Sequence, residues 1–294
     1  MKKKIVLAGG TGFIGTYLHK QYTEQGYEVL VISRQPNAIH WNNKTGIVNA
    51  LDGAEILINL AGKSVDCRYN EKNKAEILSS RIDTTNILGE ALSQCKQAPE
   101  LWVNSSTATI YRHAEDRPMT ESTGEIGSGF SVGIATQWEA AFFKFKYPST
   151  RQVALRIAIV LGDEGGAMRP LKNLVHFGLG GKQGSGKQHF SWIHIEDIKN
   201  IIQFIQEHKN MSGIYNCSSP NPSTNAILMK ELRKVMHAPF GLATPAWLLT
   251  IGAFLIRTET ELVLKSRWVL PERLIKSGYT FKHTDLKEAL EDLV

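Results

Sequence analysis

Cysteine is scarce in this chain, which has only Cys67, Cys95 and Cys217 in 294 residues. The three lie far apart and follow no paired or metal-like spacing. An odd, sparse set is typical of a reducing compartment rather than of a disulfide framework, so we expect a cytoplasmic protein. The sequence also predicts no metal site, because His194 has no second ligand at helical spacing.

Long hydrophobic runs are absent as well. The first apolar stretch, residues 5–8, is too short for a signal peptide and is followed at once by glycines. The run from Trp247 to Ile256 covers ten residues. A membrane span needs about 20 residues, so we expect a packed helix there and no membrane partner.

No cluster of basic residues with interleaved aromatics is present, although the net charge is +6. A nucleic-acid partner is therefore not expected. A basic surface also suits a phosphorylated ligand. Hydrophobic residues make up 42% of the chain and charged residues 21%, which is an ordinary globular balance.

Apolar segments of strand type alternate with segments of helix type in the first half of the chain. Such alternation predicts a parallel sheet that helices cover on both faces. The expected strands are residues 5–8, 28–33, 54–60, 101–105 and 153–160, and the expected helices are residues 13–25, 72–95 and 135–145.

The texture changes after Leu161. Residues 162–186 are rich in glycine and basic residues, and residues 192–195 and 213–217 are interpreted as short returns to the sheet. From Pro220 onward a largely helical segment is expected. The predicted fold is an α/β fold, a doubly wound parallel Rossmann sheet with a smaller, mostly helical C-terminal lid domain. The expected bounds are 1–163 for the Rossmann domain, with sheet returns near 189–218, and 164–188 with 219–294 for the lid.

A glycine-rich turn follows the first expected strand. It fits G-x-G-x-x-G at Gly10, Gly12 and Gly15, and G-x-x-G-x-x-G when Gly9 is counted first. In this position, between a strand and a helix, the pattern predicts dinucleotide binding at the helix N-terminus. The alternative is a tight turn without a ligand. The expected cofactor contacts in the turn are Gly9, Thr11, Gly12, Phe13, Ile14 and Gly15.

The second expected strand ends with Ser33 and Arg34 and carries no acid there. NAD-preferring sites usually place Asp or Glu at this point to bind the ribose 2′-hydroxyl. Arg34 can pair with a 2′-phosphate and Ser33 can add a hydrogen bond, whereas Glu28 lies at the other end of the strand. NADP(H) is therefore expected in preference to NAD(H). The alternative for Arg34 is a solvated surface arginine.

Taken with Asn59-Leu60-Ala61-Gly62 and with Ser105-Ser106-Thr107 followed by Tyr111, these motifs resemble the extended short-chain dehydrogenases/reductases. That superfamily includes the nucleotide-sugar epimerases and dehydratases. Other segments resemble, more closely, a subgroup labelled NAD-dependent epimerase or SulA-like cell-division inhibitor. They are Arg81 to Thr85, Trp138-Glu139, Gly178 to Asp197, Pro271 to Leu274 and Asp285 to Leu290, so the resemblance covers essentially the whole chain.

The resemblance implies an NAD(P)-dependent, epimerase-like or oxidoreductase activity. It also implies that Leu60, Ala61 and Gly62 line the cofactor at its ribose and nicotinamide end. The small side chains of the last two suit a close contact. An ordinary strand-to-loop exit is the alternative for this segment.

The catalytic pattern of the resembled enzymes is incomplete here. They use a Tyr-x-x-x-Lys pair with a Ser or Thr hydroxyl, and the lysine lowers the pKa of the tyrosine. Val132 and Thr136 stand where the pair is expected, and neither can act as acid or base. The remaining candidates are Thr107 or Ser106 for the hydroxyl and Tyr111 as a substitute acid, with a packed aromatic as the alternative for Tyr111.

Three further residues are weighed. Glu121 and Glu139 are carboxylate candidates, although a surface helix position also explains Glu139. His194 is interpreted as a buried structural histidine hydrogen-bonded to Asp197.

Two functions remain open on sequence grounds. One is an NADP(H)-dependent oxidoreductase or epimerase-like enzyme that acts on a small molecule bound between the Rossmann domain and the lid. The other is a non-catalytic NADP(H)-binding regulator or redox sensor, which the missing pair favours. Lys182 and Lys187 flank Gly184-Ser185-Gly186, a loop that could hold an anionic group of the substrate or effector, or form a mobile surface loop. A homodimer is left open.

Overall fold

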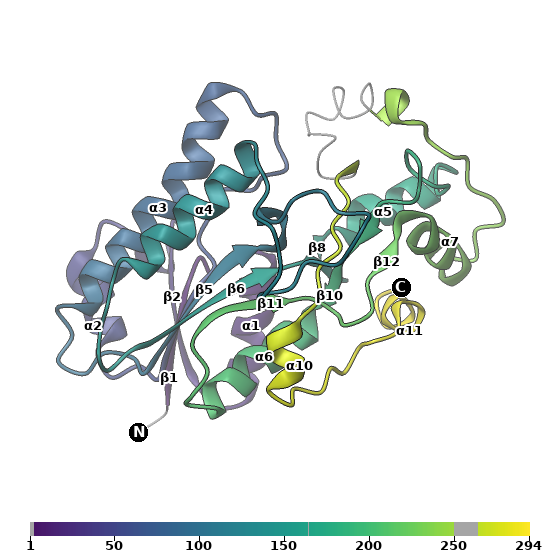
Figure 1. Ribbon diagram of the computed structural model, residues 1–294. Coiled ribbons are helices and arrows are strands. Elements are labelled where there is room, and N and C mark those ends of the chain that lie inside the picture. Colours follow the sequence, from purple (N-terminus) through teal and green to yellow (C-terminus); the bar gives the residue numbers. More distant parts are fainter. Residues whose placement is uncertain (1–2, 164, 250–263) are drawn as a thin grey trace.

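The computed structural model describes residues 3–163, 165–249 and 264–294. Its centre is a seven-stranded parallel sheet in the order β11-β6-β5-β4-β1-β2-β3 (Figure 1). Strand β1 lies between β4 and β2, so the sheet is wound in two directions from it. The strands are β1 (Lys4–Ala8), β2 (Glu28–Ser33), β3 (Ile39–His40), β4 (Ile56–Asn59), β5 (Leu101–Thr107), β6 (Arg151–Ile157) and β11 (Gly213–Cys217).

Helices cover both faces of the sheet. Helices α2 (Lys44–Leu51), α3 (Glu71–Leu92) and α4 (Phe130–Phe143) share one apolar cluster with the sheet. Helices α1 (Phe13–Glu24) and α6 (Ile195–Glu207) share another on the opposite face. The expected doubly wound Rossmann sheet is confirmed.

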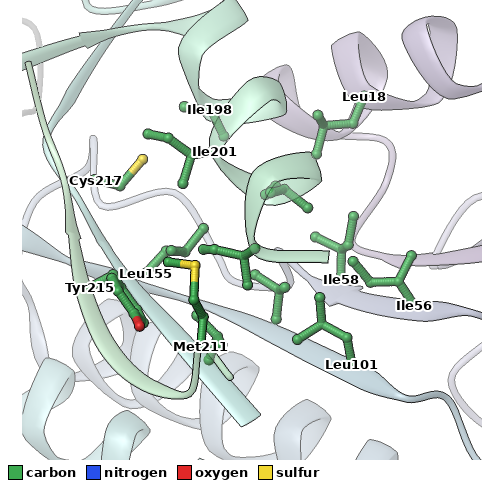
Figure 2. Packing of buried hydrophobic residues seen from close by; sticks show 14 of the residues in the cluster. Leu18, Ile56, Ile58, Leu101, Leu155, Ile198, Ile201, Met211, Tyr215 and Cys217 are labelled. Atoms are coloured by element: carbon green, nitrogen blue, oxygen red, sulfur yellow. The ribbon is translucent and has the colours of Figure 1, made fainter. Parts of the chain in front are cut away.

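The alternation of side chains along each strand supplies both clusters. Ile5 and Leu7 of β1 pack on the α1 and α6 side, whereas Val6 and Ala8 pack on the other side. Successive strand residues point to opposite faces, so a strand buried on both faces must be apolar throughout. Figure 2 shows the α1 and α6 cluster, in which sheet residues such as Ile58 face Leu18 and Ile201 of the helices.

A smaller C-terminal part packs around its own apolar cluster, which includes the fully buried Trp192. Residues 266–270 follow in the chain and form isolated bridges, Arg267 with Phe190 and Val269 with Met119. Its elements are β7 (Ile159–Gly162), β8 (Gly165–Gly166), α5 (Met168–His176), β9 (His189–Phe190), β10 (Trp192–His194), β12 (Ser223–Thr224), α7 (Asn225–Val235) and α11 (Leu286–Glu291). Helix α10 (Glu272–Lys276) instead packs on the main sheet, where its Leu274 joins the α1 and α6 cluster.

Several sequence expectations need correction. Residues 192–194 do not return to the main sheet, because β10 pairs with β7 in a separate three-stranded sheet. Helix α4 begins at Phe130, five residues earlier than expected, after Gly129 with its φ of 97°. Helix α2 was not expected, and its N-terminus is capped by the Asn43 side chain.

The run from Trp247 to Ile256 lies for the most part outside the described residues. Within the described part of the chain, no helix has the length and apolar character needed to cross a membrane. The bounds of the two domains stay a prediction.

Side chains protect the outer edge of the sheet at β11. The Arg273 guanidinium donates to the carbonyls of Ile214 and Ser212, at 2.6 and 2.9 Å. The Glu121 carboxylate accepts the Asn216 N–H at 2.8 Å. Three of the backbone groups that an eighth strand would pair with are therefore already hydrogen-bonded.

Candidate functional site

The glycine-rich turn connects β1 to α1 at the carboxyl end of the sheet. Gly9 has φ of 77°, and a Cβ on it would stand 2.7 Å from the backbone of Ala61. A Cβ on Gly15 would stand 2.6 Å from Cα of Gly10. Both contacts are too short for any side chain, so packing of the turn itself requires glycine at positions 9 and 15.

Gly12 differs from these two glycines. Its φ of −83° suits any residue, and the nearest atom to an added Cβ is the Gly9 carbonyl oxygen at 3.7 Å. Gly12 is the N-cap of α1, makes no side-chain cap, and no acid follows in the first turn. Open space thus lies directly over the positive end of a 12-residue helix.

Phe13, the first residue of α1, is held by the β7–β8 hairpin. Added Cβ atoms on Gly162, Gly165 and Gly166 would approach its ring to 2.6–2.7 Å. Three glycines therefore allow the hairpin to lie flat on this ring. Ile14 points the other way and packs against the α1 and α6 cluster, and Thr11 is exposed.

The end of β2 lies beside this turn, because β2 is hydrogen-bonded to β1. Ser33 is buried and its hydroxyl accepts the Gln35 N–H at 3.0 Å, which fixes the exit of the strand. Arg34 is exposed. Glu28 lies at the far end of the same strand, as expected.

The segment after β4 forms the neighbouring wall. The buried Asn59 carboxamide accepts the Ala61 N–H at 3.1 Å and donates to Thr85 and Asn104. Trp138 of α4 donates its indole N–H to the same Thr85 hydroxyl at 3.0 Å. This buried network holds Leu60, Ala61 and Gly62 in place next to Gly9.

Arg81 of α3 lies against this wall. Its guanidinium carbon would be 3.0 Å from a Cβ on Gly62, and it lies 5.1 Å from the centre of the Trp138 ring. Sequence reasoning cited Arg81 as part of a family motif and gave it no role. Its contact with Gly62, 19 positions earlier in the chain, left no signal in the sequence.

The three catalytic candidates lie at the end of β5, and two of them are committed to a buried network. The Ser106 hydroxyl donates to Glu139 at 2.6 Å. Arg156 forms a bidentate pair with Glu139 and donates to the Tyr111 oxygen at 2.9 Å. Tyr111 in turn donates to Asn216 at 2.9 Å.

These contacts change the interpretation of Tyr111 and Glu139. Tyr111 is 2% exposed, and burial raises its pKa, although Arg156 acts in the opposite direction. A raised pKa argues against a tyrosinate base, whereas the predicted role of Tyr111 as an acid is opposed by its burial and by the two hydrogen bonds that already engage its oxygen. Glu139 is buried at 7% exposure and is not a surface carboxylate. The sequence did not indicate a role for Arg156, because nothing distinguishes it locally from other residues of its strand.

Thr107 is the candidate hydroxyl that remains partly accessible. Its oxygen accepts the Thr109 N–H at 3.1 Å, so the hydroxyl hydrogen keeps its freedom to donate elsewhere. Val132 is buried, and the Thr136 hydroxyl bonds back to the Val132 carbonyl. Neither supplies the acid–base function of the missing pair.

Basic and aromatic side chains from residues 264–271 approach the end of β5. Lys265 donates to the Thr109 carbonyl at 2.8 Å, and Arg267 donates to the Thr109 hydroxyl at 3.1 Å. Trp268 stacks on His189 with a centroid distance of 4.0 Å. The C-terminal part thus covers the end of the strand that carries Thr107.

The loop with Lys182 and Lys187 is fixed to α7. Gln183 exchanges hydrogen bonds of 2.8 and 3.0 Å with Asn225, and both lysines are exposed. Glu121 lies at the β11 edge beside a surface groove of about 430 Å³.

His194 is buried, but its partner is not Asp197. Its Nδ1 accepts the Glu196 N–H at 3.3 Å, and its ring stacks on His283 at 3.7 Å. The Asp197 carboxylate instead accepts from Tyr279 and from the backbone of Lys282 and His283. The prediction of a hydrogen bond to Asp197 is therefore wrong, and the buried His194, which is the N-cap of α6, lies at the contact with the C-terminal segment.

Second and third metal-type ligands do approach His194, contrary to the spacing argument. Ligand atoms of His194, His283 and Asp292 lie within 4.8 Å of one another. However, an Nδ1 that accepts an amide N–H places the proton of a neutral imidazole on Nε2. This Nε2 lies 3.3 Å from an Asp292 oxygen, which suits an Asp–His contact.

Comparison with known proteins gives concordant results. Residues 5–218 match the model of the NAD dependent epimerase/dehydratase family, and residues 244–293 match a domain of unknown function (DUF1731). Mouse epimerase family protein SDR39U1 is 32% identical over 297 residues, with 99% of both chains covered. Bacillus subtilis epimerase family protein YfhF is 32% identical over 300 residues, with 99% of this chain and 97% of that protein covered.

Among solved structures, human epimerase family protein SDR39U1 (isoform 2) with NADPH superimposes with a TM-score of 0.90 and 31% identity. The match covers 99% of this chain and 98% of that one. The resemblance drawn from the motifs is confirmed over the same length of chain. This chain belongs to the NAD dependent epimerase/dehydratase family.

Proposed function

We propose that this protein binds NADP(H) across the carboxyl ends of β1, β2 and β4. The observation that carries the proposal is Gly12, where the folded chain itself gives no reason for glycine. A pyrophosphate lying on the α1 N-terminus supplies that reason, because its oxygens need close access to the first amides of the helix. The residues proposed to hold it are Gly9, Thr11, Gly12, Phe13, Ile14 and Gly15, with Leu60, Ala61 and Gly62 along the neighbouring wall.

The preference for NADP(H) over NAD(H) is proposed from the end of β2. Arg34 is exposed beside the turn and offers a guanidinium to a 2′-phosphate. Ser33 is less free than the sequence alone indicates, because its oxygen already accepts an amide N–H. The NADPH in the related human structure supports the same preference.

For the reaction, we propose an oxidoreductase or epimerase-like activity on a small molecule held between the sheet and the C-terminal part. When bound, the nicotinamide would supply hydride transfer. Of the predicted catalytic residues, Thr107 is the one best placed to orient a substrate oxygen, because Ser106 and Tyr111 are engaged in the Arg156 network. An anionic substrate group would be favoured by the basic residues that approach the Thr109 position.

The second candidate function is a non-catalytic NADP(H)-binding regulator or redox sensor. The observation that favours it is the closed hydrogen-bond network of Ser106, Glu139, Arg156, Tyr111 and Asn216. It leaves two of the three predicted catalytic side chains without a role toward a ligand. We also propose a cytoplasmic location and leave a homodimer open. Both are compatible with either function.

Titration of the purified protein with NADPH and with NADH tests the cofactor proposal. We expect tight NADPH binding, weaker NADH binding, and convergence of the two affinities in Arg34→Gln. If neither cofactor binds, the proposal fails. If NADPH binds but is not oxidised with any of a broad panel of small carbonyl compounds, the regulator is favoured over the enzyme.

A further inference from the structure

Arg81 carries a positive charge in an unusual setting. Its Nη1 donates to two backbone carbonyls, those of Lys63 at 3.1 Å and Ile77 at 2.9 Å. Its side chain is only partly exposed, and within residues 3–163, 165–249 and 264–294 the group that acts to raise its pKa is Tyr69 rather than a carboxylate. Burial lowers the pKa of Arg81 to about 10.

Such a cation costs free energy unless an anion or other acceptors compensate it. The guanidinium also lies over the Trp138 ring, and this cation–π contact offsets only part of the free energy that the cation loses on desolvation. Two carbonyl bonds through a single nitrogen leave Nη2 and Nε, the two nitrogens closest to Gly62, with donors to spare.

The position of Arg81 fixes which part of a dinucleotide it could reach. Arg34 lies at the end of β2, on one side of the glycine turn, and Gly62 follows β4 on the other side. In doubly wound folds a dinucleotide extends in both directions from the turn. Arg34 thus marks the adenosine half and Arg81 the half that carries the nicotinamide.

We propose that Arg81 binds the phosphate and ribose oxygens of the nicotinamide half of NADP(H), an inference that rests on the proposed cofactor function. The lysine of the usual Tyr-x-x-x-Lys pair holds the nicotinamide ribose from α4, where this chain has Thr136. Arg81 supplies a cation to the same half from α3. The Trp138 ring and the Lys63 carbonyl hold its guanidinium in place.

The test uses three probes on Arg81→Met and, as a matched control, Arg34→Met. The probes are NADPH, NADH and adenosine 2′,5′-bisphosphate, which lacks the nicotinamide half. Arg81→Met should weaken NADPH and NADH each by about tenfold or more and leave the bisphosphate within about twofold. Arg34→Met should weaken NADPH and the bisphosphate and spare NADH.

Thermal unfolding of the apo-protein separates binding from structural support, because loss of a purely structural arginine should lower the Tm. Removal of a partly buried cation that has no ion-pair partner should leave the Tm of Arg81→Met unchanged or raised. Arg81→Lys keeps the charge but lacks the planar guanidinium that can donate two parallel hydrogen bonds. It should recover part of the NADPH affinity that Arg81→Met loses.

Each adverse result has a separate meaning. If wild-type protein binds NADPH and Arg81→Met binds it equally well, this inference is wrong and the cofactor proposal stands. If Arg81→Met lowers the Tm and weakens all three probes together, Arg81 only supports the Lys63 segment. If wild-type protein binds none of the probes, the cofactor proposal fails and this inference fails with it.

Discussion

At the scale of single residues, glycine is required at different positions of one motif for different physical reasons. Gly9 and Gly15 are required by backbone contacts of 2.7 and 2.6 Å and, at Gly9, by a positive φ. Gly12 has neither constraint. A sequence motif alone does not separate these reasons, because it records only the letter at each position.

This difference predicts opposite outcomes for two substitutions. Gly12→Ala should change the free energy of unfolding by less than about 1 kcal/mol and weaken NADPH binding by about tenfold or more, because its methyl group enters the open space. Gly9→Ala should destabilise the fold by about 2 kcal/mol or more.

Urea unfolding and NADPH titration on the same preparations measure both effects. Thr11→Ala, which changes an exposed side chain in the same turn, serves as the control for stability. A Gly12→Ala protein that binds NADPH normally would contradict the placement of the pyrophosphate.

At the scale of elements, the buried Arg156–Glu139 pair ties α4 to β6. Ser106 from β5 and Tyr111 from the turn that follows add hydrogen bonds to the same pair. Both charged groups have lost most of their water, so each depends on the other for compensation.

We therefore expect Glu139→Ala to lower the free energy of unfolding by about 3–5 kcal/mol, because it leaves the Arg156 cation buried and unpaired. In a cycle of wild type, Glu139→Leu, Arg156→Met and the double variant, the double variant should lose much less than the sum of the two single changes. Denaturant unfolding of the four proteins gives the coupling. Additive losses would mean that the pair has no special role.

Except for β3 and α2, the sequence predicted the order and type of the elements in the main sheet, because apolar strands buried on both faces are recognisable one segment at a time. It left Glu139 open between a site carboxylate and a surface position, because its partner Arg156 comes from another element, 17 positions later. The same limit hid the pairing of β10 with β7. Contacts between distant segments have no local pattern, and here they decide which polar side chains are free to meet a ligand.

At the scale of the whole molecule, the C-terminal segment is fastened to the Rossmann domain beside His194. Asp197 of α6 accepts three hydrogen bonds from residues 279–283. His283 and Asp292 from that segment lie against His194 from one side, and Glu196 follows it in the chain. The joint therefore contains a buried imidazole between titratable groups.

This joint predicts a dependence of stability on pH. Burial and the neighbouring His283 lower the pKa of His194 to about 4 from its ordinary value of 6.5. As the pH falls from 6.5 to about 4, His194 is therefore protonated in the unfolded chain but stays neutral in the folded protein. Stability is fully present above pH 6.5 and should decline toward pH 4, by about 1.4 kcal/mol per unit at most.

Urea unfolding at pH 7.5, 6, 5 and 4 measures this decline. His194→Gln should flatten it, whereas His19→Gln, which alters an exposed histidine of α1, should leave it unchanged. An identical decline in His194→Gln would assign the pH dependence to other groups.

The protected edge at β11 bears on how the molecule behaves when crowded by copies of itself. A parallel sheet of seven strands presents a long row of backbone donors and acceptors at its last strand. Arg273 and Glu121 occupy that row from the side. Two side chains that take no part in the proposed chemistry thus act against fibrous self-association, since an incoming strand would have to displace them to pair with Ile214 and Asn216 in full.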